Sequence, residues 1–318
     1  MRLSYIGAAY DRTLALMTGA VRPDGIELDY TVGMPNEIFR RMFSTGDFDA
    51  SELSSSNYII ERARGDRRFV ALPVFPSRVF RHNGIYVNVA AGIERPEDLR
   101  GKRVGVPEYL QTANFWIRGF LQHDHGVEPG ALRWVRGDTE KLTVPLPAGL
   151  DLIDAPPGRT LSDLLDAGEI DALIAPRTPP CFLAGSPRVR RLFPNFAAVE
   201  VEYFRRTGHF PIMHLVAVRR EVYERDRSLA RRLYDAFVAA KEYAYAQLRQ
   251  SVYLSTSLPL QIAHAEETWR LFGDDPFAYG LARAGHTVAA VAQYVHEQGM
   301  ADRVLDVEEL FVPELLDT

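Results

Sequence analysis

Short apolar runs alternate with segments of helical spacing along the first ninety residues. The runs at 3–8, 26–32 and 69–72 predict buried or half-buried strands. Between them, residues 35–43 carry apolar side chains three and four positions apart, which predicts an amphipathic helix. Three serines at 54–56 precede another helical stretch and suit the N-cap position. This order predicts an α/β sheet whose ligands bind at the carboxyl ends of its strands.

A second series of strands and helices follows Asn88. Residues 98–106 combine a short helix, a tight turn and a strand, and residues 171–175 form another buried strand pattern. Residues 143–157 are a predicted loop because of their prolines, and residues 189–208 also read as loop-rich. These patterns predict a second α/β unit within the chain.

The apolar run at 210–218 returns the chain to the first unit. Residues 229–250 then show the clearest helical period of the sequence, and residues 258–316 are predicted to be mostly helical. One α/β unit inserted into another is the architecture of type II periplasmic binding proteins. We therefore predict a two-lobed α/β fold of that type, with two crossover segments near Tyr86 and Leu215 and a helical C-terminal extension. The predicted lobes are 1–86 plus 215–318, and the inserted 88–213.

The composition is that of a globular protein with one large domain or two ordinary ones. Of the 318 residues, 47% are hydrophobic and 25% are charged, which suffices for a full core. The net charge of −5 and the lack of a basic tail argue against nucleic acid as a partner. Because neither a membrane-spanning run nor a leader-like segment occurs, we expect a cytoplasmic protein with no membrane partner. The single cysteine, Cys181, excludes an intrachain disulfide and a cysteine metal cluster.

One stretch without acidic residues, Pro73–Val87, brings cationic and aromatic side chains together after a predicted strand. Loops that leave buried strands sit on a rigid frame, so binding groups are often held there. Arg78 and Arg81 each present a planar fork that suits a carboxylate, and His82 can move a proton near neutral pH. A solvated basic loop is the alternative, and the stretch by itself does not decide between the two.

Seven segments, in order along nearly the whole chain, carry a family resemblance. They are Tyr10–Thr13, Phe48–Ser54, Pro73–His82, Gly101–Tyr109, Asp171–Arg177, Phe210–His214 and His296–Gly299. Together they resemble the 4,5-dihydroxyphthalate decarboxylase family, which implies the binding-protein fold and non-oxidative decarboxylation of 4,5-dihydroxyphthalate to 3,4-dihydroxybenzoate by a carboxy-lyase. The chain departs from the family pattern at Tyr279–Thr287, where Glu-Pro-Asn-Arg is expected after Tyr-Gly-Leu.

The implied reaction needs a cation for the retained carboxylate, a proton donor at the ring carbon and an acceptor at the phenol. Arg78, Arg81 and Arg177 are the expected anchors, because each lies just after a predicted strand. A surface or interlobe salt bridge is the alternative role for each. Four further candidates for substrate binding, with capping or supporting roles as alternatives, are Asp11, Arg12, Ser54 and Thr112.

His82 and His214 are the expected proton carriers. We prefer His82 as the acid because it shares a loop with two of the arginines. Each histidine has a structural, hydrogen-bonded role as its alternative. Glu52 and Glu108 close predicted strands, and each is a candidate phenol acceptor or an ion-pair partner. Of these two carboxylates, Glu52 is assigned to catalysis and Glu108 to substrate binding.

No organic cofactor is expected, because the phenol itself supplies the electrons for the reaction. A divalent metal held by His82, His214 and a carboxylate is a minority alternative. The competing function is that of a solute-binding protein for an aromatic or carboxylated ligand, without catalysis. Under either function the partner is a small aromatic carboxylate, and a homo-oligomer is left open.

Overall fold

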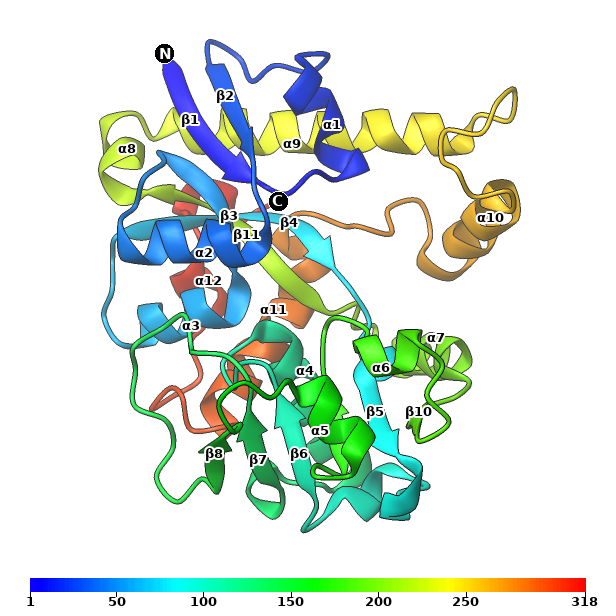
Figure 1. The fold of residues 1–318 in the computed structure, drawn as a ribbon. Helices are drawn as coiled ribbons and strands as arrows, with labels where there is room; N and C mark the ends of the chain where they lie inside the picture. Colours follow the sequence, from blue (N-terminus) through cyan, green and yellow to red (C-terminus); the bar gives the residue numbers. More distant parts are fainter. The chain divides into compact units, whose positions relative to one another are not determined.

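The computed structural model describes residues 1–318 and contains two β-sheets flanked by helices (Figure 1). Contacts divide the chain into two compact units, each built from separate stretches. Unit 1 consists of residues 1–78, 214–289 and 305–318, and unit 2 of residues 79–213 and 290–304. Strands and helices alternate through most of the chain, which confirms the predicted α/β class.

Unit 1 is built on a five-stranded sheet with the order β2-β1-β3-β11-β4. Its strands are β1 (Arg2–Gly7), β2 (Glu27–Val32), β3 (Ala50–Ser54), β4 (Phe69–Arg78) and β11 (Ile212–Arg219). Its helices are α1 (Asp11–Thr18), α2 (Pro35–Ser44), α3 (Ser55–Ala63), α8 (Arg220–Arg225), α9 (Ser228–Arg249), α10 (Gln261–Phe272), α12 (Val307–Leu310) and the first half of α11 (Leu281–Glu297).

The central strand β3 is buried along its whole length. β1 runs parallel to β2 and β3, whereas β11 runs antiparallel to β3. A polar side chain on β3 is therefore held away from water and needs partners inside the unit. Glu52 is the charged residue of this strand.

Helix α9 packs along α1, as Figure 1 shows for the long yellow helix. Its buried face repeats every three or four positions and includes Leu233, Phe237, Ala240 and Ala244. The observed bounds, 228–249, confirm the helix predicted from that period.

Unit 2 is built on a six-stranded sheet with the order β10-β5-β9-β6-β7-β8. Its strands are β5 (Ile85–Asn88), β6 (Arg103–Val106), β7 (Arg133–Arg136), β8 (Leu152–Asp154), β9 (Ala172–Ile174) and β10 (Val189–Arg191). Its helices are α4 (Thr112–His125), α5 (Leu161–Ala167), α6 (Pro180–Leu183), α7 (Phe196–Thr207) and the second half of α11. Two regions differ from the predicted loops, because β8 lies within 143–157 and α7 fills most of 189–208.

The chain passes between the units at four places, two more than the sequence predicts. The first follows Arg78 and not Tyr86, because β5 pairs with β9 and β10 of unit 2. Residues 290–304 also belong to unit 2, since the ring of Tyr294 packs edge-on against Trp116 of α4. No helix of the structure combines the length and the apolar character needed to cross a membrane.

Candidate active site

The pairing of β3 with β11 brings two of the predicted catalytic residues together. In the antiparallel register His214 lies opposite Ser54, and Glu52 lies opposite Val216. Glu52 and His214 are therefore diagonal neighbours on the same face of the sheet, within reach of long side chains. Nδ1 of His214 is hydrogen-bonded to Oε1 of Glu52.

Glu52 is fully buried and has three donors around its carboxylate. The amide of Ala8 donates to Oε2 at 2.9 Å, and the hydroxyl of Tyr10 donates to Oε1 at 2.6 Å. Burial by itself raises the pKa of Glu52, but the charge of His214 and the hydrogen bonds outweigh burial and lower the pKa below its usual value. Glu52 is therefore an ionised carboxylate inside the unit.

This carboxylate sets the orientation of His214. A carboxylate only accepts hydrogen bonds, so Nδ1 of the imidazole carries the donated proton. The imidazole also meets Phe39 of α2 edge-on, with the ring centroids 4.9 Å apart. Its side chain is 15% exposed, and Nε2 is the ring nitrogen left for a bound molecule.

Tyr10 also links the pair to Arg12. The guanidinium of Arg12 lies 4.2 Å from the ring centroids of both Tyr10 and Phe277. Its Nε donates to the carbonyl of Pro76 at 2.6 Å, and one terminal nitrogen is paired with Asp11 at 3.0 Å. Arg12 is thus a cation held in place, and the ring of Tyr10 lies between it and the buried carboxylate of Glu52. Asp11, its ion-pair partner, is half-exposed.

Two more tyrosines, Tyr5 and Tyr30, lie near Glu52. The hydroxyl of Tyr30 donates to the carbonyl of Ala8 at 2.9 Å, and the ring of Tyr5 packs against that of Tyr30. A Cβ on Gly7 would lie 2.8 Å from the Tyr5 hydroxyl and 2.9 Å from the Tyr30 hydroxyl. Glycine at position 7 therefore makes room for these hydroxyls.

Ser54 and Arg78 are the remaining predicted site residues of unit 1, and both are buried. Ser54 directly precedes α3, and its Oγ lies 3.5 Å from that of Ser56. Arg78 ends β4, and one of its terminal nitrogens donates to the carbonyl of Ala278 at 2.9 Å. Burial lowers the pKa of Arg78 to about 10, so the side chain keeps its charge at neutral pH. The stretch predicted as a loop at Arg78 is the end of a buried strand.

His82, the preferred acid of the sequence analysis, lies in unit 2 inside an aromatic cage. Its ring stacks on Phe120 at 4.1 Å and meets Tyr203 and Phe193 at 5.0 and 5.6 Å. The side chain is buried, and burial lowers its pKa to about 4. A neutral histidine in such a cage is a poor proton donor near pH 7, so the geometry favours His214 over His82.

Arg81 and a residue that the sequence analysis missed form a second polar group of unit 2. Nε of Arg81 lies 3.3 Å from the sulfur of Met213, and burial lowers the pKa of this arginine to about 10. Glu200 of α7 accepts the amide of Asn83 at 3.2 Å. Burial raises the pKa of Glu200 to about 7, although Arg81 opposes that shift. Glu200 is not among the residues predicted from sequence, because residues 189–208 are predicted to be loop-rich.

Glu108, Thr112 and Arg177 are the other three predicted residues of unit 2. Glu108 is buried and paired with Lys141 at 3.2 Å, which agrees with the ion-pair alternative. Thr112 is the first residue of α4 and is buried, whereas Arg177 is exposed. The structure contains no group of three or more His, Cys, Asp or Glu side chains that could hold a metal ion. In unit 1, His214 is hydrogen-bonded to Glu52. In unit 2, His82 is surrounded by aromatic rings.

The comparisons with known proteins agree with the resemblance in the sequence. The 4,5-dihydroxyphthalate decarboxylase of Comamonas testosteroni is 40% identical over 324 residues, covering 100% of this chain and 98% of that protein. The chain belongs to the 4,5-dihydroxyphthalate decarboxylase family. A second member, from Pseudomonas putida, is 42% identical over 211 residues, covering 64% of this chain and 82% of that protein. No protein-family model matches the chain.

Solved structures support the predicted fold at much lower identity. The periplasmic aliphatic sulphonate binding protein SsuA from Escherichia coli is 15% identical, with a TM-score of 0.56 and coverage of 100% of this chain and 99% of that chain. A mutant of the desulfurization enzyme DszB in complex with biphenyl-2-sulfinic acid is 16% identical, with a TM-score of 0.54 and coverage of 99% and 97%. These likenesses confirm a periplasmic-binding-protein-like fold and bear on the fold alone.

Proposed function

We propose that this chain removes one carboxylate from 4,5-dihydroxyphthalate as carbon dioxide and leaves 3,4-dihydroxybenzoate. The observation that carries the proposal is the buried Glu52–His214 pair in a chain that is 40% identical to a decarboxylase of this name. An ionised, fully buried carboxylate fixed to a partly exposed imidazole is the arrangement expected of a proton-transfer site.

His214 is the proposed acid. In its protonated form it donates the proton on Nε2 to the ring carbon that bears the leaving carboxylate, while the para hydroxyl feeds electron density into the ring. The bond to the carboxylate then breaks, its electron pair restores the aromatic ring, and carbon dioxide leaves. The imidazole regains its proton from solvent, so each turnover consumes one proton. Glu52 holds the ring through Nδ1 and balances the imidazolium charge.

Arg12 is the proposed anchor for the retained carboxylate. It lies against the Tyr10 ring whose hydroxyl contacts Glu52, and its guanidinium is held by Pro76 and Asp11. Such a fixed planar cation suits a carboxylate. Further substrate contacts are proposed for Arg78, Arg81, Arg177, Ser54, Glu108 and Thr112.

The reaction as written uses no organic cofactor, because the phenol supplies the electrons. The alternative is a metal-dependent mechanism in which a divalent ion binds the two phenol oxygens. A chelator distinguishes the two mechanisms. Incubation with EDTA followed by dialysis leaves turnover unchanged on the preferred mechanism. A loss of turnover that added Mg²⁺, Mn²⁺ or Zn²⁺ restores would favour the metal mechanism.

A solute-binding protein without catalysis is the second candidate function. It is favoured by the fold shared with the sulphonate-binding protein SsuA. The two functions differ in one observable, because only the enzyme changes its ligand. The deciding experiment incubates the pure chain with 4,5-dihydroxyphthalate and measures carbon dioxide and 3,4-dihydroxybenzoate. Binding of the dicarboxylate by calorimetry without any product would establish the binder and overturn the decarboxylase.

A further inference from the structure

A stretch of unit 1 distant in sequence from the candidate site differs in composition from the rest of the chain. Residues Gln250–Ala265, here called the uncharged segment, contain no Asp, Glu, Lys or Arg, although 25% of the whole chain is charged. The segment joins α9 to α10 and includes the first residues of α10. Charged side chains are depleted at the centres of protein interfaces, so this composition suits a surface that is covered.

The apolar side chains of the uncharged segment are exposed. Val252 is 93% exposed, Leu260 64%, and Tyr253 and Leu258 58% each. Six of the sixteen exposed large hydrophobic residues of the chain lie in these few positions, the other two being Leu254 and Ile262. Single exposed hydrophobics are ordinary, whereas a contiguous group of them marks an interaction site.

Hydrogen bonds from two glutamines hold the segment in a defined shape. Oε1 of Gln250 accepts the amides of Val252 and Tyr253 at 3.0 and 3.1 Å. Oε1 of Gln261, the buried residue of α10, accepts the amide and the hydroxyl of Thr256 at 2.7 and 2.8 Å. The exposed side chains are thus presented by an ordered backbone, which lowers the entropic cost of binding a partner.

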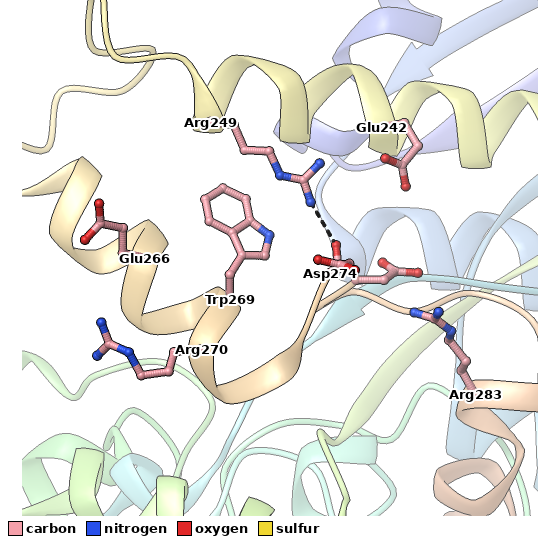
Figure 2. A pocket seen from close by; sticks show the side chains of 8 residues that line it. Glu242, Arg249, Glu266, Trp269, Arg270, Asp274 and Arg283 are labelled. Carbon is pink, nitrogen blue, oxygen red and sulfur yellow. Dashed lines mark hydrogen bonds between the residues drawn. The ribbon is translucent and has the colours of Figure 1, made fainter.

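The surface beside the uncharged segment carries both signs of charge. Arg249 of α9 lies over the ring of Trp269 of α10, with 4.9 Å between Cζ and the ring centroid (Figure 2). Both residues border a surface hollow of about 750 Å³. Its lining is Glu242, Arg249, Glu266, Trp269, Arg270, Asp274, Asp275 and Arg283. Figure 2 shows both carboxylates and guanidinium groups around this hollow.

We propose that the uncharged segment is the contact through which two copies of this chain pair. In a two-fold interface a surface patch meets itself, so a rim of one sign would repel its copy. A rim with both signs allows each arginine to face a carboxylate of the other copy.

The same features argue against a lipid surface as the occupant. Helices that lie on membranes combine an apolar face with an excess of Lys and Arg, which attract anionic lipids. The uncharged segment has no cations, and the adjoining rim contains Glu242, Glu266 and Asp274 among its arginines. A second copy of the chain would cover the apolar side chains and would offer carboxylates and arginines to the charges of the rim.

The test measures molar mass by light scattering and sedimentation equilibrium at several concentrations. The wild type is expected at twice the chain mass of 35.8 kDa, or at a higher even multiple. Leu258→Asp combined with Leu260→Asp should at least halve that mass, because two carboxylates would be buried against their copies. The matched control is Leu183→Asp on α6, where an equally apolar side chain is 72% exposed, and it should keep the wild-type mass.

A second variant covers the case in which the aspartates disturb folding. Leu258→Ser with Leu260→Ser should fold, as judged by circular dichroism, and should raise the dimer dissociation constant at least tenfold. A wild type that has the mass of one chain at every concentration overturns the proposal. So does a folded Asp or Ser variant with an unchanged mass, and so does binding of monomers to anionic vesicles through this segment. Because the readout is mass, the result is independent of whether the chain decarboxylates its ligand.

Discussion

Glu52 and His214 share a hydrogen bond although 162 residues separate them in the sequence. The two side chains meet because β3 and β11 are antiparallel neighbours and the residues are diagonal across the pair. Two neighbouring strands of one sheet therefore supply both members of the proposed proton-transfer pair. Strands hold side chains more rigidly than loops do, which suits a group that must point at one ring carbon.

The first prediction concerns this pair. His214→Gln should reduce kcat by about 10²–10⁴, the usual effect of losing a general acid, and should leave dicarboxylate binding largely intact. Glu52→Gln should also reduce kcat, because it removes the charge that balances the imidazolium. Turnover with 4,5-dihydroxyphthalate and calorimetric binding of the same compound check both variants. Glu37→Gln on the exposed side of α2 is the control. Near wild-type kcat for folded His214→Gln would refute the assignment of the acid.

The second prediction separates a charged from a neutral hydrogen bond. Tyr10→Phe removes a donor to the buried Glu52 carboxylate and should lower the free energy of unfolding by roughly 1.5–3 kcal/mol. Tyr30→Phe removes a hydrogen bond to the carbonyl of Ala8 and should lower it by only about 1 kcal/mol. Urea denaturation of both variants gives the comparison. Equal losses of unfolding free energy in the two variants would show that the Tyr10–Glu52 hydrogen bond is no stronger than the neutral Tyr30–Ala8 hydrogen bond.

The third prediction uses His82. Its folded pKa of about 4 lies below the ordinary value of 6.5, so the unfolded chain binds the proton more readily. This group therefore contributes stability that is present above pH 6.5 and is lost as the pH falls toward 4. The loss should be up to about 3 kcal/mol, since one pKa unit corresponds to 1.36 kcal/mol.

Replacement of His82 separates its structural role from catalysis. His82→Gln should flatten the decline of Tm between pH 6.5 and 4 and should keep turnover at neutral pH within severalfold. The exposed His286→Gln should change neither profile. If His82→Gln instead abolishes turnover in a folded protein, His82 and not His214 is the acid.

The fold was predictable from sequence where the pattern was local. The spacing of apolar residues defined α9 and α2 within a residue or two at each end. The same spacing did not predict α7, because few of its side chains are buried and its polar residues are typical of a loop. It also failed for the three-residue strand β8, which is stabilised by pairing with β7 and has no strand pattern of its own. Tertiary pairing thus decided where local preference was weak.

The sequence predicts Glu52 and His214 as separate candidates and does not predict that they are neighbours. Glu52 is predicted to close a strand and His214 lies within the apolar run 210–218, yet only the strand register places the two side chains together. His82 looked reactive because it follows Arg81, and the burying ring of Phe120 comes from a helix some forty residues on. Tyr10 was missed although it follows the first strand, which is the position where ligands of α/β sheets are usually met.

The fourth prediction concerns Glu200, whose pKa of about 7 lies above the ordinary 4.5. A raised carboxyl pKa means that the folded state holds the proton more tightly, so stability is lost as the pH rises from about 4.5 to 7. Glu200→Gln should therefore gain stability relative to the wild type between pH 5 and pH 8. The gain should be roughly 1–2 kcal/mol after allowance for solvent around the group. Thermal unfolding at both pH values checks it, and an equal difference at the two would contradict it.

The last prediction concerns the buried ammonium of Lys241. Its Nζ lies 2.7 and 2.6 Å from the two carboxylate oxygens of Asp275, which also accepts the Tyr245 hydroxyl at 2.9 Å. The lysine is 2% exposed, and burial lowers its pKa despite this partner. The pair ties α9 to the turn before α11.

Breaking such a pair on one side leaves the other charge poorly compensated. Lys241→Met should therefore lower the free energy of unfolding by about 3 kcal/mol, at the lower end of the range for buried pairs because Asp275 keeps some access to water. Lys241→Met combined with Asp275→Leu should be less destabilising than Lys241→Met alone, since no unpaired charge then remains. Denaturation of the single and double variants measures the difference. A double variant that is less stable than Lys241→Met would show that the ion pair itself, and not the stranded carboxylate, accounts for the effect.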